Sequence, residues 1–445
     1  MITEVLKNGV LLCCLLLIAL LTLFGTASAQ LHIEEPSLLN RPIADIVITG
    51  NYVTDEKVIL SEMKTRKGVI PTREMLELDM LRVQGLDIFT RVEFFLLESA
   101  GKSVLNIVVT EEWYIFPLPY WSLSDDTPPE LTYGFRFQQK NFRGRNETLS
   151  ISLWSGDDRG YMLSHTTPRL RGNPTLTSSV SLYQITQTSN NLAVKDLDLE
   201  SRHTVAQFAI GKRWTREFVS GIGCRFHLVR AENPLQLAGD GLLDRIVETH
   251  VSTTWDGRDL RQLSRRGLFG SVRYVQGWVL SLKQQYQRFS VDLRSYLPYH
   301  FISLCSRLQW HPSWGSLPPY DWTIIDDNSY IRSVNLSDEG ESFYSATFEI
   351  RFDLLPLRYF TWQRAPYFKQ YFTNLQYGLA AEIFLETGDA YSISDKTSVD
   401  NLMWGYGVGL LLRLPYADVI RLESSWNPEY SFSDVLLSWK LGISF

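Results

Sequence analysis

The last nine residues of the chain alternate strictly between apolar and polar side chains. Leu437, Trp439, Leu441, Ile443 and Phe445 are apolar or aromatic, whereas the residues between them are small or polar. This period of two predicts a strand with one polar and one apolar face, because successive side chains of a strand point to opposite sides. From these residues alone, a strand on a soluble core fits as well as a strand that faces lipid.

Similar alternating runs recur through residues 113–445. Each is about ten residues long, and turn residues separate one run from the next. Clear examples are 149–154, 344–354, 375–385 and 406–412. Since a strand with its connection takes roughly twenty residues, this stretch of 333 residues predicts about sixteen strands. An open sheet of that size is expected to curl or split.

The run at 344–354 has two chemically different faces. One face carries Tyr344, Ala346, Phe348, Ile350, Phe352 and Leu354, and the other carries Ser345, Thr347, Glu349, Arg351 and Asp353. A soluble sandwich would turn the apolar face inward, whereas a membrane barrel turns it to lipid and places the charges in the lumen. Periodicity alone does not distinguish between these two arrangements. The strand count, an aromatic content of 13% and the lack of a second helical layer favour the barrel.

Residues 41–112 follow another pattern, which predicts a small α/β unit. A short strand comes first, then two helices that Thr54 and Thr72 can cap, and then two strands at 91–97 and 104–110. The predicted order of elements in this unit is therefore β-α-α-β-β.

Residues 1–29 have the features of a secretory signal peptide. A lysine precedes an apolar run at 10–24 and small residues end at Ala29, so we expect cleavage there and a linker at 30–40. The apolar run is shorter than the ~20 residues that a membrane-spanning helix needs, although a retained membrane helix is the alternative. No later segment reaches ~18 consecutive apolar residues, so the exported chain is expected to be soluble or to cross a membrane as a closed barrel.

Composition and charge exclude several other classes of function. The net charge of −6 and the isoelectric point near 5.7 argue against nucleic acid as a partner. The seven histidines are scattered, and the sequence has no catalytic, phosphate-binding or metal-binding motif. We therefore expect no enzymatic activity, cofactor or metal; a barrel hydrolase with a site assembled from distant strands is the alternative. After the signal only Cys224 and Cys305 remain, and they could pair in an oxidising compartment.

Four short segments of the α/β unit carry a family resemblance. They are I-T-G-N at 48–51, Thr54, G-L-D-I-F-T-R-V at 85–92 and V-V-T-E at 108–111. With them the unit resembles a POTRA domain, the periplasmic module of the BamA/TamA superfamily, or bacterial surface antigen family. The resemblance implies that the domain binds unfolded polypeptide by strand addition, since an edge strand has unpaired N–H and C=O groups. A domain that only spaces or anchors the barrel is the alternative.

Three turns of residues 113–445 are similar to landmarks of the same family. They are N-F-R-G-R-N-E at 141–147, P-R-L-R-G at 168–172, and D-G-R-D at 256–259 with R-G at 266–267. Each is common alone, but their order along the chain is specific. The resemblance implies a mainly β fold, with a 16-stranded antiparallel transmembrane β-barrel at 113–445 behind a POTRA domain at 41–112.

A further motif precedes the run at 344–354. It consists of Ile331, Arg332, Ser333 and Val334, and it resembles the V-R-G-F/Y loop motif of the family. The resemblance implies an arginine in the lumen against acidic residues, and a partly dehydrated arginine needs a carboxylate. We expect Arg332 to pair with Glu386, in a segment similar to the family's F-x-D-x-G strand end, with Glu349 as the second candidate. Ser333, Val334 and Glu386 depart from the family's glycine, aromatic and aspartate, and an exposed arginine in a surface loop is the alternative.

The C-terminal strand resembles the signal by which such barrels are recognised for insertion. The residues that carry this similarity are Trp439, Leu441, Ile443 and Phe445. The resemblance implies a protein of the cell outer membrane, with its POTRA domain in the periplasm, that assembles or translocates other proteins. It would capture unfolded outer-membrane protein clients by β-augmentation and insert them through or beside the barrel seam. Outer-membrane lipid and assembly-machinery proteins are further implied partners. A passive outer-membrane pore or structural barrel without insertase activity is the alternative function.

Overall fold

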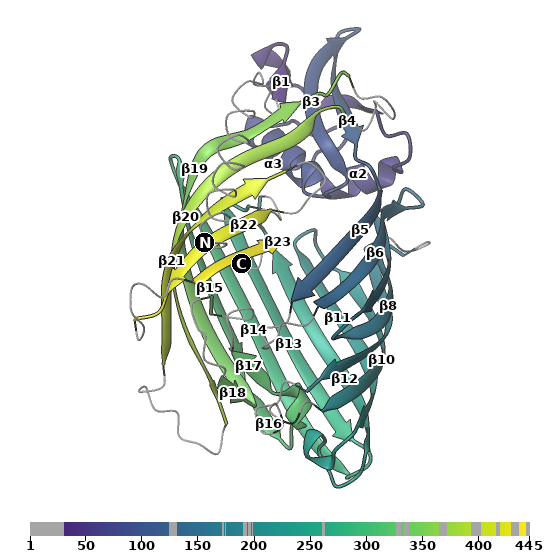
Figure 1. The fold of residues 1–445 in the computed structure, drawn as a ribbon. Coiled ribbons are helices and arrows are strands. Elements are labelled where there is room, and N and C mark those ends of the chain that lie inside the picture. The colour runs from purple at the N-terminus through teal and green to yellow at the C-terminus, as the bar shows by residue number, and fades with distance from the viewer. Residues whose placement is uncertain are drawn as a thin grey trace.

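The structure is a computed structural model in which a small α/β domain adjoins a large antiparallel β-barrel (Figure 1). The residues it describes are 31–123, 131–170, 173, 175–189, 194, 197, 199–259, 263–325, 331–332, 338–364, 372–392, 402–414, 419–428 and 436–441. In this described part of the chain, no helix is long and apolar enough to cross a membrane.

The α/β domain has a four-stranded sheet covered by two helices. Its elements are β1 (Leu31–Ile33), η1 (Pro36–Asn40), β2 (Ile43–Thr49), α2 (Glu56–Glu62), α3 (Arg73–Gln84), β3 (Phe89–Ser99) and β4 (Lys102–Glu111). The strands lie in the order β1-β3-β4-β2, with β1 and β2 at the edges. Leu76, Met80 and Val83 recur on one side of α3 and are buried in the hydrophobic core, as the helical period requires.

Two local details differ from the sequence predictions. Thr72 caps α3 as expected, with its hydroxyl accepting from the backbone N–H of Met75 at 3.1 Å, but α2 is capped by Asp55 rather than Thr54. Thr54 instead donates its hydroxyl to Glu111 at 2.6 Å, a tertiary contact that sequence cannot show. The segment expected to be a linker forms β1 and η1, and Leu38 in η1 is fully buried against the domain core.

Sixteen antiparallel strands form the barrel wall, which confirms the predicted fold class. They are β5 (Ile115–Leu123), β6 (Leu131–Phe142), β7 (Glu147–Ser155), β8 (Arg159–Thr167), β9 (Leu176–Thr188), β10 (Glu200–Arg213), β11 (Phe218–Ala231), β12 (Leu243–Asp256), β13 (Gly267–Val279), β14 (Gln284–Tyr299), β15 (Ile302–His311), β19 (Ser342–Phe360), β20 (Leu375–Tyr391), β21 (Met403–Arg413), β22 (Ile420–Trp426) and β23 (Leu436–Leu441). The connection from β15 to β19 carries the short elements β16 (Ser313–Gly315), η4 (Pro319–Asp321), β17 (Thr323–Ile325) and β18 (Asp338–Gly340). A further short helix, η3 (Pro234–Gln236), follows β11.

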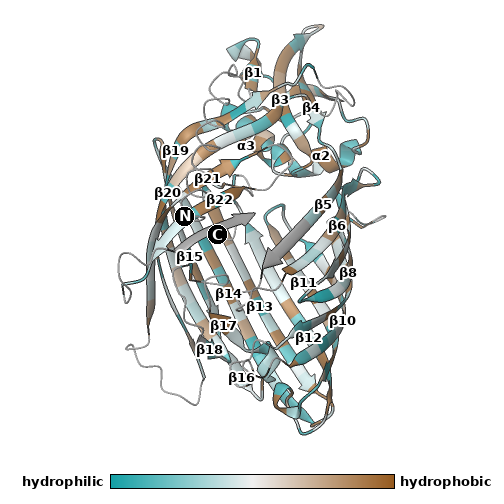
Figure 2. Ribbon diagram, viewed as in Figure 1, coloured by the Kyte–Doolittle hydropathy of each residue, from teal (hydrophilic) through white to brown (hydrophobic). Residues whose placement is uncertain are grey.

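The burial pattern of β19 decides which face of the wall meets lipid. Phe348 and Leu354 are 44% and 56% exposed, whereas Glu349 and Arg351 are 0% and 3% exposed. Apolar side chains therefore point outward and charged ones into the lumen, which is the arrangement of a membrane barrel. Hydrophobic and hydrophilic residues alternate along many of the wall strands in the same way (Figure 2).

The wall is incomplete between its first and last strands. In the strand order β23 neighbours β5, as in a barrel. Within the described residues, registered pairs run in chain order from β5 to β23, and none joins β23 back to β5. The sheet is therefore not closed at this position, which we call the seam (Figure 1).

The α/β domain is attached to one mouth of the barrel through its helices. Glu62 at the end of α2 forms an ion pair with Arg213, the last residue of β10, at 2.9 Å and another with Arg169 in the turn after β8. The side chain of Arg82 in α3 pairs with Glu217 at 3.0 Å. Burial would raise the pKa of Glu217, but a backbone hydrogen bond and the charges of Arg82 and Arg216 lower it overall.

A turn of the wall also contacts this domain directly. The backbone carbonyl of Gly144 accepts from the N–H of Asp55 at 2.8 Å, and the Asn141 amide donates to the Thr54 hydroxyl at 2.9 Å. On the other side, β19 and β20 extend to the domain (Figure 1), where Thr90 donates its hydroxyl to the carbonyl of Thr373 at 3.3 Å. The domain thus rests on turns from several separate parts of the wall.

Candidate functional site

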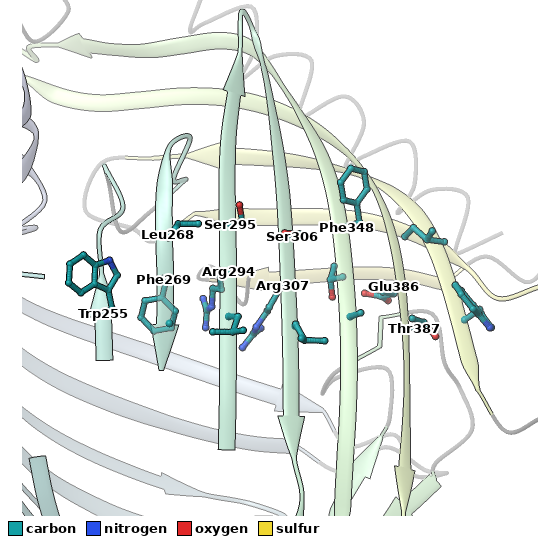
Figure 3. A pocket seen from close by; sticks show the side chains of 17 residues that line it. Trp255, Leu268, Phe269, Arg294, Ser295, Ser306, Arg307, Phe348, Glu386 and Thr387 are labelled. Atoms are coloured by element: carbon teal, nitrogen blue, oxygen red, sulfur yellow. The ribbon is translucent and has the colours of Figure 1, made fainter. Parts of the chain in front are cut away.

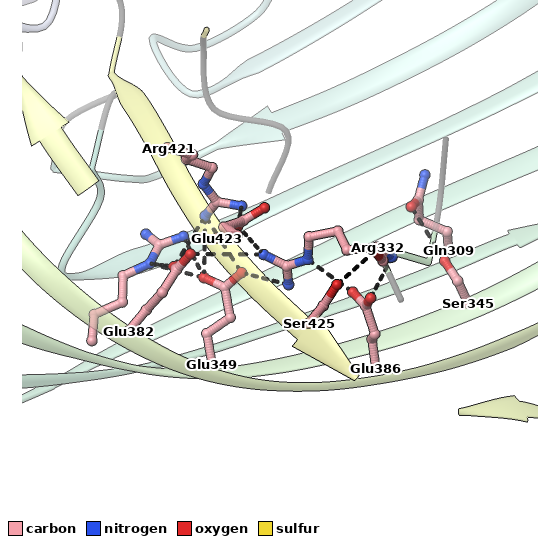
Figure 4. A network of polar contacts seen from close by, with 10 residues as sticks. Gln309, Arg332, Ser345, Glu349, Glu382, Glu386, Arg421, Glu423 and Ser425 are labelled. Carbon is pink, nitrogen blue, oxygen red and sulfur yellow. Dashed lines mark hydrogen bonds and ion pairs between the residues drawn. The ribbon is translucent and has the colours of Figure 1, made fainter. Parts of the chain in front are cut away.

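Arg332 lies inside the barrel and binds three carboxylates at once (Figure 4). Its Nε donates to Glu386 at 3.0 Å, its Nη2 to Glu349 at 3.1 Å and its Nη1 to Glu423 at 2.6 Å. Its backbone N–H also donates to Glu386. The guanidinium lies 3.7 Å from the ring centroid of Phe384, so a cation–π contact completes its surroundings.

Both carboxylates that the sequence proposed for Arg332 therefore lie against it. Ile331 is fully buried and packs with Ile325, Phe343 and Ala390, which fixes the position of the loop. Ser333 and Val334 lie outside the described residues. The surface-loop alternative does not fit, because Arg332 is 6% exposed.

Two further arginines and one further carboxylate extend the group. Arg351 Nη2 binds Glu349 at 2.7 Å, and Arg421 binds both Glu382 and Glu423 at 3.3 Å. We call the seven residues the lumen cluster: Arg332, Arg351, Arg421, Glu349, Glu382, Glu386 and Glu423. Every member is less than a tenth exposed, so each charge needs the others for compensation.

Sequence reasoning missed Glu382, Glu423 and Arg421. Strand alternation was a usable signal for all three, since Glu382 shares a strand face with Glu386, and Arg421 and Glu423 share one as well. Alternation shows which face of a strand these side chains occupy, but it does not show which residues of other strands lie next to them. Only the tertiary structure shows that β21 lies between β20 and β22 and so brings these side chains close together.

Glycines on β21 provide the space that the lumen cluster occupies. A Cβ at Gly409 would lie 2.8 Å from the Glu382 carboxylate, and one at Gly407 would overlap the ring of Phe384. Side chains at these positions would displace the carboxylate or the aromatic ring that holds Arg332. The cluster consequently ties the inward loop to β19, β20 and β22, the last of which adjoins β23.

A second ionic group lies further along the lumen. Glu248 accepts from Arg225 at 3.1 Å, from Arg288 at 2.7 Å and from the Tyr286 hydroxyl at 2.7 Å. Nearby, Tyr320 of η4 donates to Asp244 at 3.1 Å. The connection between β15 and β19 is thus held to the inner wall at this level too.

Comparison with known families identifies the two parts of the chain. An Omp85 superfamily domain matches residues 141–445, which is more than half of the protein. The chain belongs to the Omp85 superfamily. A POTRA model, described as a surface antigen variable number repeat, matches residues 42–112. Proteins of the Omp85 superfamily sit in the outer membrane with their POTRA domains in the periplasm, and they are transporters and assembly factors.

Solved structures share this fold at low sequence identity. BamA from Haemophilus ducreyi lacking POTRA domains 1–3 is 11% identical, with a TM-score of 0.55 over 90% of this chain and 84% of that one. CdiB from Escherichia coli is 12% identical, with a TM-score of 0.56 over 91% and 76%. CdiB from Acinetobacter baumannii is 13% identical, with a TM-score of 0.51 over 90% and 72%. No curated protein matches the chain in sequence.

The remaining predicted residues of this Omp85 protein lie as follows. Trp439 and Leu441 belong to β23, opposite Leu422 and Ile420 of β22. Ile443 and Phe445 lie outside the described residues. Cys224 on β11 and Cys305 on β15 are both free thiols. The described part of the chain has no group of acidic, histidine and cysteine side chains that could hold a metal ion.

Proposed function

We propose that this Omp85 protein assembles other proteins into the outer membrane or translocates them across it. In this proposal the POTRA domain, residues 41–112, captures an unfolded client strand. The client is then inserted through or beside the seam between β5 and β23 of the barrel, residues 113–445. The observation that carries the proposal is that, among the described residues, no registered pair joins β5 to β23 across the seam.

The contrast in strand pairing supports a seam that can open. In the described part of the chain, six residue pairs join β23 to its other neighbour, β22, whereas thirteen join β10 to β11 in the middle of the wall. Each backbone hydrogen bond contributes little net free energy, so a short ladder separates more readily than a long one. An exposed strand edge is a template for another strand.

The lumen cluster anchors β22, the strand that adjoins β23 next to the seam. Arg421 holds β22 to Glu349 of β19 and Glu382 of β20, and Glu423 holds it to Arg332 of the inward loop. Separation at β23 therefore leaves the rest of the wall anchored. Burial of a client's apolar surface in lipid supplies the driving force, so no nucleotide is needed.

On the POTRA domain the available edge is β2. The strand at the other edge, β1, has only three residues that the structure describes, Leu31–Ile33, and is therefore a shorter template than the seven-residue β2. Among the described residues no strand pairs with the outer side of β2, and Val47 at its centre is 43% exposed. We therefore assign client capture to β2.

Reconstitution in liposomes tests the insertase proposal. We expect an unfolded barrel client to fold faster in liposomes that contain this protein than in empty ones. A disulfide between cysteines placed in β5 and β23, in a background without Cys224 and Cys305, should remove the acceleration. The matched control is a disulfide between positions 206 and 226, which are directly opposite in the fully paired β10 and β11. Folding no faster than in empty liposomes, or full activity of the locked seam, would contradict the proposal.

A photo-crosslinking amino acid at position 47 tests the capture edge. We expect adducts with an unfolded client from Val47 and few from Ile70, which is more exposed but lies off the sheet. Equal labelling at both positions would mean that capture does not depend on strand addition.

The passive pore is less well supported, because the lumen cluster and the attached POTRA domain occupy the lumen and one mouth. A pore predicts normal levels of other outer-membrane proteins after depletion of this protein and steady conductance in planar bilayers. The assembly proposal predicts reduced levels of its clients.

A further inference from the structure

A groove crosses the lipid-facing side of the barrel from β12 to β21 (Figure 3). Its volume is about 710 Å³. One row of directly opposed residues runs along it, from Trp255 on β12 to Trp404 on β21. Three positions of this row have small side chains, namely Gly270, Ala346 and Thr387. The groove is therefore built where the wall lacks bulky side chains.

A second row adjoins the first and forms the other side of the groove. Ser295 and Ser306 face each other at its centre, and Leu268, Phe348 and Leu385 continue it on either side. Small residues thus lie between large apolar ones in both rows. This arrangement makes a channel-like depression rather than an isolated pit.

The lining identifies the chemistry of an occupant. Arg294 and Arg307, on neighbouring positions, point to the lumen and bind Asp292 at 2.7 and 2.9 Å. The outward side chains carry no charge, and the Thr387 hydroxyl is satisfied by the Met403 carbonyl at 2.8 Å. An uncharged, mostly apolar depression within transmembrane strands favours hydrocarbon over a headgroup or a charged peptide.

The two tryptophans at the ends of the row lie at different heights of the wall. Trp255 is next to the end of β12 near the POTRA domain, and Trp404 is next to the start of β21 at the opposite end of the wall. Six strand-to-strand steps of ~4.8 Å separate them, or roughly 29 Å along the row. The row runs across strands that tilt by about 35–45° from the membrane normal, so it crosses the wall obliquely and spans roughly 17–20 Å of depth, within a hydrocarbon core about 30 Å thick.

We propose that the groove is a binding site for the acyl chain of a membrane lipid. The bilayer already covers this face, so the groove is continuous with the lipid contact of the whole barrel. A flexible chain can follow the depression and regain the dispersion contacts that the small side chains do not supply. A lipid held there exchanges more slowly than lipids along the rest of the wall.

Native mass spectrometry after detergent extraction tests the site. The probes are dipalmitoyl phosphatidylethanolamine and dipalmitoyl phosphatidylglycerol, which share acyl chains and differ in headgroup. We expect the protein to retain one molecule of either lipid. Filling the groove with Gly270→Leu and Ala346→Leu should lower retention about tenfold, since a leucine-sized apolar contact is replaced. A Cβ at Gly270 meets only Leu293 at 3.4 Å, so the change fits the wall.

The matched control is Ala206→Leu, another small outward residue, which lies between Leu182 and Phe226 on the far part of the wall. The Ala206→Leu variant should retain as much lipid as the unaltered protein. Folding of each variant is checked by its heat-modifiable migration in electrophoresis. Equal retention by the filled variant, loss of lipid in the Ala206 control, or retention of only one of the two headgroups would overturn the proposal.

Discussion

Removal of the Arg332 guanidinium should destabilise the barrel more than any other single change of charge in its wall. Arg332→Met keeps most of the length and apolar volume of the side chain but deletes four ion pairs, those to Glu386, Glu349, Glu423 and Glu382. The four carboxylates of the lumen cluster would then share only Arg351 and Arg421. One or more of them must be protonated or hydrated for the barrel to fold.

The magnitude follows from burial. A buried charge that loses its partner costs about 3–5 kcal/mol, and each hydrogen bond to a charged group contributes about 1.5–3 kcal/mol. Because the carboxylates can take up protons, the total loss of unfolding free energy should be about 3–5 kcal/mol. It should not reach the sum of the separate hydrogen bonds. Arg332→Lys retains the charge but not the planar fork, so its effect should be smaller.

A double-mutant cycle with Glu386→Gln measures the coupling. The assay is the midpoint of heat-induced unfolding, followed by electrophoretic migration without boiling. We expect Arg332→Met to lower the midpoint strongly and the double variant to lose less than the sum of the single ones. Arg159→Met is the control, since Arg159 and Glu200 form an equally close two-bond pair that is exposed to solvent. Strict additivity at Arg332 and Glu386, or equal effects at Arg159 and Arg332, would refute the reasoning.

Three further predictions concern the attachment of the POTRA domain. Glu62→Gln should cost about 3–5 kcal/mol of docking free energy, because it leaves the buried Arg169 and the partly buried Arg213 without their carboxylate, and it should speed limited proteolysis after residue 112; Glu98→Gln, in an exposed pair, should not. Gly144→Ala should loosen the same contact, since Gly144 has a φ of +69° and a Cβ would overlap the Val53 carbonyl; unchanged proteolysis would contradict this. The pKa of Glu217 is lowered in the folded protein, so its contribution to docking is present above its ordinary pKa and is lost as pH falls through the lowered value. Glu217→Gln should abolish that acid-dependent step in proteolysis, and an unaltered pH profile would exclude Glu217 as its origin.

Much of the architecture was readable from periodicity and family resemblance. The period of two along residues 113–445 gave a 16-stranded wall, and Thr72 marked the start of a helix. Capping and alternation depend on residues near one another in sequence, so sequence is enough for them. The first helix shows the limit, because Thr54, which the sequence predicted as its cap, contacts the distant Glu111 and the neighbouring Asp55 caps the helix instead.

Sequence by itself determined which side chains of a strand share a face, and only the tertiary structure decided what each face meets. Glu349 and Phe348 would alternate identically in a soluble sandwich, and curling of the sheet into a barrel put one in the lumen and the other outside. Likewise, Arg332 belongs to a motif that predicted a carboxylate partner. Its contact with Glu423, however, depends on the strand order and register across β20, β21 and β22. Side-chain direction follows from local backbone geometry, whereas neighbours across a sheet follow from the long-range closure of the chain.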